Sequence, residues 1–344
     1  MAASIRQIAE ASNVSITTVS RVLRGRGEIS DETRRRVQAT AARLKYRPNL
    51  LVKGLQTGRT QTIGVLMSAE DPFLATIVAG IQDGLAEADH APLILRTVKN
   101  CDGYVGPTEL QQIHRLVDRR VDAVILRPVE DAASDDYLRE VWDRGLPLVA
   151  VDRRLPQSRA DFVGSDDPGG AAAAAEHLIS LGHRRLAQIS GPRFTSTGRE
   201  RAESFERVIA RAPGATCRTL EEPTFRGGQE QAQALLQAAD PPTAIFCGND
   251  IIAANVYQTA THLGLRIPQD VSIVGFCDLD FAQWLQPPLT TVRQNGYEIG
   301  RQAAGLVLQR LDDELAPTQA QVIRVATQVG IRASTARRPS EAGL

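Results

Sequence analysis

Residues 4–23 read SIRQIAEASNVSITTVSRVL, and this stretch determines how the start of the chain is organised. Its apolar residues recur at helical spacing in two short runs, which predicts two helices. Ser4 and Ser15 stand just before these runs, where N-capping residues belong, and Ser12–Asn13 supplies turn-forming side chains between them. This pattern is a helix-turn-helix, whose second helix, about residues 15–23, is expected to enter the DNA major groove. A small helical bundle without a nucleic-acid role is the structural alternative.

The charge of the chain is unevenly distributed. Residues 1–60 contain 12 Lys and Arg against 4 Asp and Glu, a net charge of +8. The remaining 284 residues contain 28 against 36, a net charge of −8, so the overall charge of zero conceals two opposite parts. A basic head on an acidic body is typical of a polyanion-binding module joined to a different function. A third helix, capped by Ser30, completes a predicted α-helical head domain over residues 1–47.

Length and composition restrict the class of protein. A chain of 344 residues is expected to form two or three domains. It contains no apolar run of 18 residues and does not begin like a secretory signal, so we expect no membrane segment and a cytoplasmic location. The four cysteines are widely spaced without a CxxC pair, which argues against a disulfide framework or a zinc site. No metal and no cofactor are therefore expected.

From residue 61 onward, strand-like and helix-like segments alternate. This alternation predicts an α/β body made of two doubly wound parallel-sheet lobes. The predicted strands are 62–67, 93–97, 123–126, 148–151, 186–190, 244–247 and 271–276, with a last strand pair at 321–325 and 328–330. The predicted helices are 109–119, 136–144, 169–181, 199–211, 228–238 and 250–263, after one that carries Phe73, Ile77, Ile81 and Leu85.

The predicted domain boundaries follow from these segments. A hinge helix and linker cover 48–60, the first lobe covers 61–160 with 291–318, the second covers 161–290 with 319–332, and 333–344 form a polar tail. In doubly wound folds ligands bind at the carboxyl ends of strands. The polar residues at these positions are Asp71, Arg127, Asp152, Arg153, Asn249, Asp250, Cys277 and Asp278. Each alone reads more easily as a surface or capping residue, but their shared position indicates a ligand cleft between two lobes.

Several motifs resemble the lactose-repressor/galactose-repressor (LacI/GalR) family of bacterial transcription regulators. They are IRQIAEASNVSITTVSRVL at 5–23, YRPN at 46–49, VGSDDPGGA at 163–171, HLISLGHRRLA at 177–187, CGND at 247–250, IPQDVSIVGF at 267–276 and PPLTTVRQ at 287–294. The similarity spans about residues 4–332. It implies a DNA-binding head, a hinge helix and a periplasmic-binding-protein-like body, assembled as a homodimer on double-stranded, pseudo-palindromic operator DNA.

The resemblance also assigns DNA-contacting positions. Ile16, Thr17 and Arg21 occupy the base-reading positions, and the Arg21 guanidinium can pair bidentately with guanine. The residues expected to contact phosphate or to cap helices are Ser4, Ser15, Thr18 and Ser20. In the hinge, the residues expected to contact DNA are Asn49, Val52 and Leu55. Leu55 matches the leucine that wedges into a minor-groove base step. The hinge helix contains Val52, where a small Ala is usual, and Gly54, which lowers helix stability. Because so short a helix is marginal alone, we expect it to fold only on DNA.

In the body, the resemblance assigns the effector contacts. They are Asp71, Phe73, Leu74, Asp152, Arg153, Thr197, Arg201, Asn249 and Gln294, with Cys277 and Asp278 at the position where the family commonly has an Asp. Such a set suits a polyhydroxylated, carbohydrate-like ligand. Because a thiol is a weak donor and a poor acceptor, either Asp278 takes the place of that Asp or the ligand is not a typical sugar. Asp71 in place of the usual Asn also shifts the preference toward donors or cations.

The function predicted from the sequence is a sequence-specific DNA-binding regulator, a repressor controlled allosterically by a small polar effector, with a sugar or sugar derivative favoured. The alternative is a regulator whose cleft is empty or binds a nucleoside, purine or sugar acid. A solute-binding protein would not need the basic head. An enzyme is not expected, because GxGxxG, GxxxxGK[ST], HExxH and GxSxG are all missing. Inducer and co-repressor remain alternatives for the effector, and a dimer is preferred over a tetramer.

Overall fold

The computed structural model describes residues 3–23, 25, 27–46, 58–67, 71–96, 108–128, 136–155, 160–312 and 319–338. The chain divides into two compact units, residues 1–60, here called the head, and residues 61–344, the body. The predicted hinge helix at 50–57 lies outside the described residues. Among the helices of the described ranges, none has both the length and the apolar character that crossing a membrane requires.

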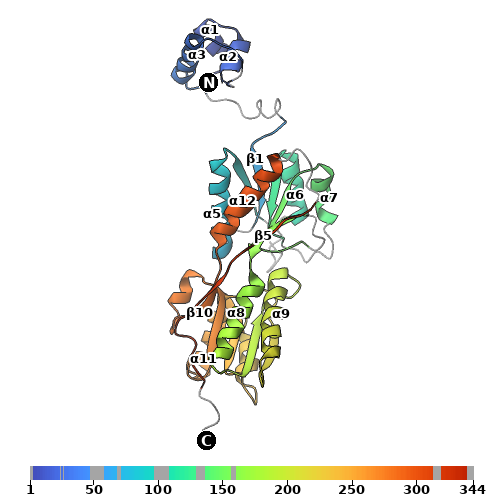
Figure 1. The fold of residues 1–344 in the computed structure, drawn as a ribbon, viewed down its shortest axis with the longest axis vertical. Coiled ribbons are helices and arrows are strands. Elements are labelled where there is room, and N and C mark those ends of the chain that lie inside the picture. Colours follow the sequence, from blue (N-terminus) through green and yellow to red (C-terminus); the bar gives the residue numbers. More distant parts are fainter. Residues whose placement is uncertain are drawn as a thin grey trace. The chain divides into compact units, whose positions relative to one another are not determined.

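The described residues of the head form three helices (Figure 1). They are α1 (Ile5–Ser12), α2 (Ile16–Leu23) and α3 (Asp31–Arg43). Their core contains Ile8, Val19 and Val37, none of which is exposed to solvent. Ser4 forms a reciprocal capping box with Gln7 at the start of α1. The predicted helix-turn-helix is confirmed, because helical spacing and capping side chains are both local properties of the sequence.

The first lobe of the body contains a six-stranded parallel sheet in the order β11-β5-β4-β3-β1-β2. Its strands are β1 (Thr62–Leu66), β2 (Ala91–Leu95), β3 (Ala123–Leu126), β4 (Leu148–Val151), β5 (Asp161–Ser165) and β11 (Val322–Val325). Its helices are α5 (Pro72–Glu87), α6 (Glu109–Asp118), η1 (Asp136–Leu138), α7 (Arg139–Asp143) and α12 (Gly296–Asp312). Two of them, α5 and α12, lie side by side on one face of the sheet (Figure 1).

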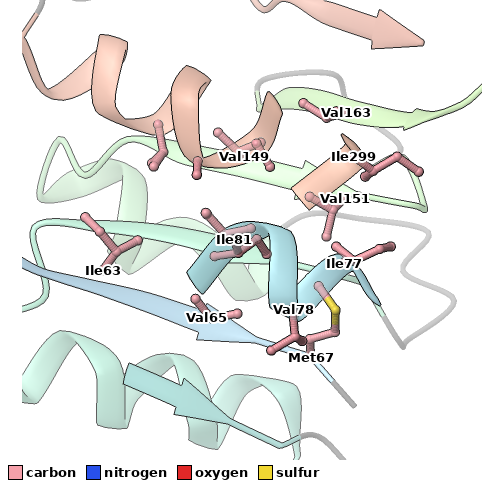
Figure 2. Close-up of a cluster of buried hydrophobic side chains, with 14 of the residues drawn as sticks. Ile63, Val65, Met67, Ile77, Val78, Ile81, Val149, Val151, Val163 and Ile299 are labelled. Carbon is pink, nitrogen blue, oxygen red and sulfur yellow. The ribbon is translucent and has the colours of Figure 1, made fainter. Parts of the chain in front are cut away.

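The core of the first lobe fills the space between that face and the two helices. Figure 2 shows Val65 of β1 and Val149 of β4 directed toward Ile81 of α5, with Ile299 of α12 in the same cluster. All four side chains are fully buried. A second buried cluster of the same lobe includes Leu116 of α6 and Val124 of β3.

The second lobe contains a six-stranded sheet in the order β12-β10-β9-β8-β6-β7, parallel except for β12. Its strands are β6 (Arg185–Ser190), β7 (Thr216–Glu221), β8 (Ala244–Cys247), β9 (Ser272–Cys277), β10 (Thr290–Arg293) and β12 (Gln328–Gly330). Its helices are α8 (Asp167–Ser180), α9 (Ser196–Arg211), α10 (Gln229–Leu236), α11 (Asp250–His262) and η2 (Asp280–Gln283). Phe205 of α9 stacks on Phe246 of β8, with 4.7 Å between the ring centroids. The predicted two-lobed α/β body is confirmed.

The predicted lobe boundaries near 160 and 291 are wrong by one strand each. The residues of β5, which the prediction placed at the start of the second lobe, pair with β4 in the first sheet. β10, whose last three residues were assigned to the first lobe, pairs with β9 in the second sheet. The predicted strands at 321–325 and 328–330 are confirmed, but their joint assignment to the second lobe is wrong, because β11 joins the first sheet and β12 the second. The chain therefore crosses between the lobes after β5, after β10 and between β11 and β12.

The last described residues also differ from the prediction of a polar tail at 333–344. Ser334 is fully buried, donates a hydrogen bond to the carbonyl of Ile273 (2.6 Å) and accepts one from the backbone N–H of Thr290 (2.8 Å). Arg338 donates its backbone N–H to the carbonyl of Leu181 (2.8 Å). Residues 333–338 are therefore part of the second lobe, because these backbone groups would otherwise be buried without partners.

Candidate nucleic-acid interface and ligand site

One face of α2 is turned away from the core of the head. Val19 and Val22 occupy the buried face, whereas Thr17 and Arg21 are exposed and Ile16 keeps 49% of its surface accessible. A large exposed apolar side chain on the same helix as an exposed arginine is suited to contact with a macromolecule rather than with water. The three predicted base-reading residues therefore share one accessible face, and their contacts with bases remain predictions.

The predicted phosphate-contacting serines have structural roles in the head. The Oγ of Ser4 accepts a hydrogen bond from the backbone N–H of Gln7 at 3.3 Å, and that of Ser15 accepts one from Thr18 at 3.0 Å. The hydroxyls of Ser15 and Thr18 are also 2.8 Å apart, and Ser20 is half-buried. Both capping serines remain exposed, so a phosphate contact can be added to the capping role. Asn49, Val52 and Leu55 lie outside the described residues.

A row of arginines on α3 adds positive charge to the head. Arg35 and Arg36 are exposed, and Arg36 lies 3.9 Å from Glu32 in a solvent-exposed pair of little strength. These guanidinium groups are free to interact with a polyanion, which is the electrostatic pattern expected of a nucleic-acid-binding module.

In the body, charged side chains from the first lobe gather at the carboxyl ends of its strands. Asp152, which follows β4, is buried and pairs with Arg127, which follows β3, at 2.6 Å. Asp71, which follows β1, accepts a hydrogen bond from the backbone N–H of Phe73 at 2.8 Å and caps α5. This edge of the first sheet therefore carries the predicted cluster of polar residues.

The second lobe contributes a buried arginine to the same region. Arg201 of α9 is 5% exposed, and its Nε lies 2.9 Å from Asp167. Its Nη1 donates to the carbonyl of Gly248 (2.8 Å), and its guanidinium carbon lies 3.9 Å from the centroid of the Phe276 ring. Burial raises the pKa of Asp167 to about 7, against the stabilising charge of Arg201. Arg201 is thus fixed in orientation by three independent contacts.

Arg153 lies where the two lobes meet. Arg127 and Asp152 of the first lobe and Arg201 of the second all act on it electrostatically. Burial, reinforced by the two arginines, lowers the pKa of Arg153 to about 9. Its guanidinium carbon is 6.0 Å from the ring centroid of Phe225 in the second lobe. The predicted residues Asp152, Arg153 and Arg201 are therefore brought together.

Sequence reasoning did not identify Phe225 as a residue of the site. Phe225 lies in the loop before α10, and its backbone has a positive φ of 62°. Its carbonyl accepts a hydrogen bond from the side-chain amide of Asn249 (2.9 Å), which holds the loop in place. An aromatic residue in a loop without strand or helix periodicity leaves no signal in a single sequence.

Cys277 and Asp278 occupy the end of β9, with positive φ angles of 117° and 60°. Both carboxylate oxygens of Asp278 are engaged, one by Arg293 Nε at 2.7 Å and the other by Arg332 Nη2 at 2.6 Å. Cys277 lies within electrostatic range of Arg201, and burial raises the pKa of its thiol well above its ordinary value. The thiol is therefore neutral, and Asp278 is held in ion pairs on its own lobe.

The other predicted effector residues fall into two groups. Asn249 caps α11 through a hydrogen bond from the backbone N–H of Ile252 (2.8 Å), and Gln294 donates to Ser165 (2.7 Å). Thr197 is buried beside Thr195, with 3.3 Å between their hydroxyls. Phe73 and Leu74 instead belong to the apolar core of the first lobe. Asn249 and Gln294 are thus polar groups of the site region, whereas Phe73 and Leu74 are first of all packing residues.

Comparisons with known proteins agree with this division into head and body. Residues 4–49 match the family model for bacterial regulatory proteins of the lacI family, and residues 175–335 match the periplasmic binding protein-like domain. The ribose operon repressor of Haemophilus influenzae is 33% identical over 313 residues, covering 90% of this chain and 92% of that protein.

The fold of this chain is also similar to those of solved structures of LacI family regulators. The Lac repressor dimer bound to operator and the anti-inducer ONPF has a TM-score of 0.83 at 24% identity, covering 98% of this chain and 100% of that one, which shows a common fold. A LacI family regulator from Enterococcus faecium with bound ribose is 28% identical, with a TM-score of 0.69 and coverage of 81% and 100%. These matches show a DNA-binding transcriptional repressor with an effector-binding domain, not an enzyme. The chain belongs to the LacI family of bacterial transcriptional regulators.

Proposed function

We propose that two copies of this chain form a homodimer in the cytoplasm and bind a pseudo-palindromic operator through their heads. The exposed face of α2 supports this proposal, because Ile16, Thr17 and Arg21 can reach base edges while Val19 and Val22 hold the helix on the core. Arg21 would recognise guanine, and the serines that cap α1 and α2 would position the head on phosphate. Asn49, Val52 and Leu55 would continue this interface into the minor groove.

Two arginine substitutions separate base reading from phosphate binding. The operator is first obtained by selecting bound fragments from random DNA, and its affinity is then measured by fluorescence anisotropy. Arg21→Ala should cost about 1–3 kcal/mol and relax the preference at one base position. Arg35→Ala should weaken all sequences alike and reduce the salt dependence by about one phosphate contact. If Arg21→Ala keeps the full sequence preference, the proposed reading face is wrong.

We infer that the body binds a small polar effector between its lobes, with a sugar or sugar derivative as the favoured class. One observation carries this inference: Asp152 and Arg153 of the first lobe meet Arg201 and Phe225 of the second, so a bound molecule would touch both lobes. A ligand with different contacts in the open and closed arrangements would shift the equilibrium between them. The relative from Enterococcus faecium was solved with ribose, which agrees with a carbohydrate-like ligand here.

The control of operator binding by the effector is reciprocal by thermodynamic necessity. If an effector weakens operator binding by some factor, the operator must weaken effector binding by the same factor. Candidate sugars, polyols, nucleosides and sugar acids are screened by thermal shift, and each hit is titrated with and without operator. A ligand whose affinity does not change in the presence of operator would contradict allosteric control.

A cleft that binds a non-sugar ligand is the second candidate. The state of Cys277 and Asp278 favours it, because the thiol is neutral and both carboxylate oxygens of Asp278 already accept hydrogen bonds from arginines. Nucleosides, purines or sugar acids that stabilise the protein where neutral sugars do not would decide for this candidate.

A further inference from the structure

The guanidinium of Arg153 differs from the other arginines around it. Arg127 is paired with Asp152 at 2.6 Å, and Arg201 is paired with Asp167 at 2.9 Å. In the described part of the chain, the guanidinium of Arg153 makes no hydrogen bond or ion pair to any side chain or carbonyl, and its Nε is buried. Among the described residues, the aromatic ring next to it is that of Phe225, with 6.0 Å between the ring centroid and the guanidinium carbon.

The nearby carboxylates do not neutralise this cation directly. Asp152 acts on Arg153 through space, but its Oδ2 accepts the hydrogen bond from Arg127. Glu109 also acts on Arg153 through space. Asp71 caps α5 and acts on Cys277 instead. The guanidinium N–H groups of Arg153 therefore have no acceptor among the described residues. Burial and the positive charges of Arg127 and Arg201 make the charged form of Arg153 unfavourable in free energy.

We propose that Arg153 binds an anionic group of the effector, a carboxylate or a phosphate, so that the effector is an anion and not a neutral sugar. This inference rests on the proposed function, because it assumes that the site between the lobes holds an effector. A planar guanidinium matches either group with two parallel hydrogen bonds, and such charge-assisted bonds are the strongest available to a side chain.

The second lobe is compatible with an anion beside Arg153. Asp278 is held by Arg293 and Arg332, Asp167 is held by Arg201, and the thiol of Cys277 is neutral. A carboxylate at position 277 would instead repel an anionic ligand from that side. Arg153 and Cys277 thus favour the same ligand class from opposite lobes.

The test uses thermal unfolding of the full-length protein with inorganic phosphate as the first probe, at constant ionic strength set with sodium chloride. The variant is Arg153→Gln, and the matched control is Arg154→Gln, whose guanidinium covers the ring of Phe162 at 5.6 Å. Phosphate should raise the melting temperature of the wild type and of R154Q by a few degrees and leave R153Q unchanged. Without phosphate, R153Q should melt no lower than the wild type, because an unpaired buried charge is removed. Should R153Q fail to fold, Arg153→Lys replaces it, with a reduced but measurable response.

Matched ligand pairs then distinguish the two kinds of anion: ribose with ribose 5-phosphate, and glucose with gluconate. The charged member should bind about tenfold tighter or more, and R153Q should remove the preference. The proposal is overturned if phosphate stabilises R153Q as much as the wild type, if phosphate stabilises neither, or if the neutral sugars bind as tightly as their charged partners. A neutral sugar that binds and releases operator would overturn this inference alone and leave the proposed function intact.

Discussion

The ion pair between Arg310 and Asp161 offers the most direct test of how the first lobe is assembled. Arg310 of α12 makes two parallel hydrogen bonds to Asp161 at the start of β5, at 2.7 and 2.8 Å. Asp161 also accepts the backbone N–H of Gln321, next to β11, at 2.7 Å. The two side chains are only 8% and 6% exposed, so this pair joins three segments distant in sequence inside the lobe.

Arg310→Met removes the cation and leaves a buried carboxylate with one backbone partner. Breaking a buried pair in this way costs about 3–5 kcal/mol, because the remaining charge is left uncompensated. The matched control is Arg144→Met, which breaks a pair with Glu140 of similar length, 2.8 Å, between side chains that are 51% and 36% exposed. That exposed pair should contribute about 1 kcal/mol or less. The double variant Arg310→Met/Asp161→Asn should recover part of the loss, because no isolated charge remains.

The assay is urea unfolding monitored by tryptophan fluorescence. The two tryptophans of the chain are Trp142 in α7 of the first lobe and Trp284 after η2 of the second. In a Trp284→Phe background the signal reports on the first lobe alone, and equal slopes with denaturant show that the same transition is being compared. A buried pair of this strength is excluded if Arg310→Met costs no more than Arg144→Met, or if the double variant is less stable than Arg310→Met.

Three further predictions concern single side chains. Ser30→Ala removes the N-cap of α3 and should cost about 1 kcal/mol, measured as faster amide exchange in that helix; unchanged exchange would exclude the cap. Burial raises the pKa of Asp250 to about 7, above its unfolded value, so its contribution to stability is complete below about pH 4 and is lost as the pH rises toward 7. Asp250→Asn should therefore flatten the fall in unfolding free energy across that window by up to about 1.4 kcal/mol per pH unit, and parallel profiles would contradict the assignment. Ser334→Ala should cost about 1–3 kcal/mol in urea unfolding, because the backbone groups of Ile273 and Thr290 lose their buried partner; a neutral effect would mean that the segment is not docked in solution.

The head could be predicted from the sequence because everything that determines it is local. The caps of α1 and α3 are side chains three residues from the backbone groups they satisfy, and the core residues follow helical spacing. The alternation of strands and helices predicted the two lobes for the same reason. In both cases the periodicity of apolar residues within a single segment predicts which face of that helix or strand is buried.

The exact positions of the crossovers between the lobes could not be predicted, because the partners of the strands at these boundaries are distant in sequence. The side chains of Asp161 and Ser165 at the two ends of β5 bond to Arg310 and Gln294, which lie 149 and 129 residues away. α12 was missed because its glycines weaken a helix prediction, although Gly300 lies against the backbone of α5 where a larger residue would collide with the carbonyl of Ile77. A residue that is unfavourable locally was thus required by packing.

The charged residues of the site could be located from the sequence, but their ion pairs could be seen only in the structure. The strand-end rule placed Asp152, Arg153 and Asp278 in one predicted set, since all three follow buried strands. It could not show that Asp152 and Asp278 are held by arginines of their own lobes, whereas Arg153 has no such partner in the described chain. A buried ion pair holds both of its side chains in place, because moving one of them would leave the charge of the other uncompensated. Only an unpaired donor can gain a full ion pair from a ligand, so the preference for one effector over another should depend most strongly on Arg153.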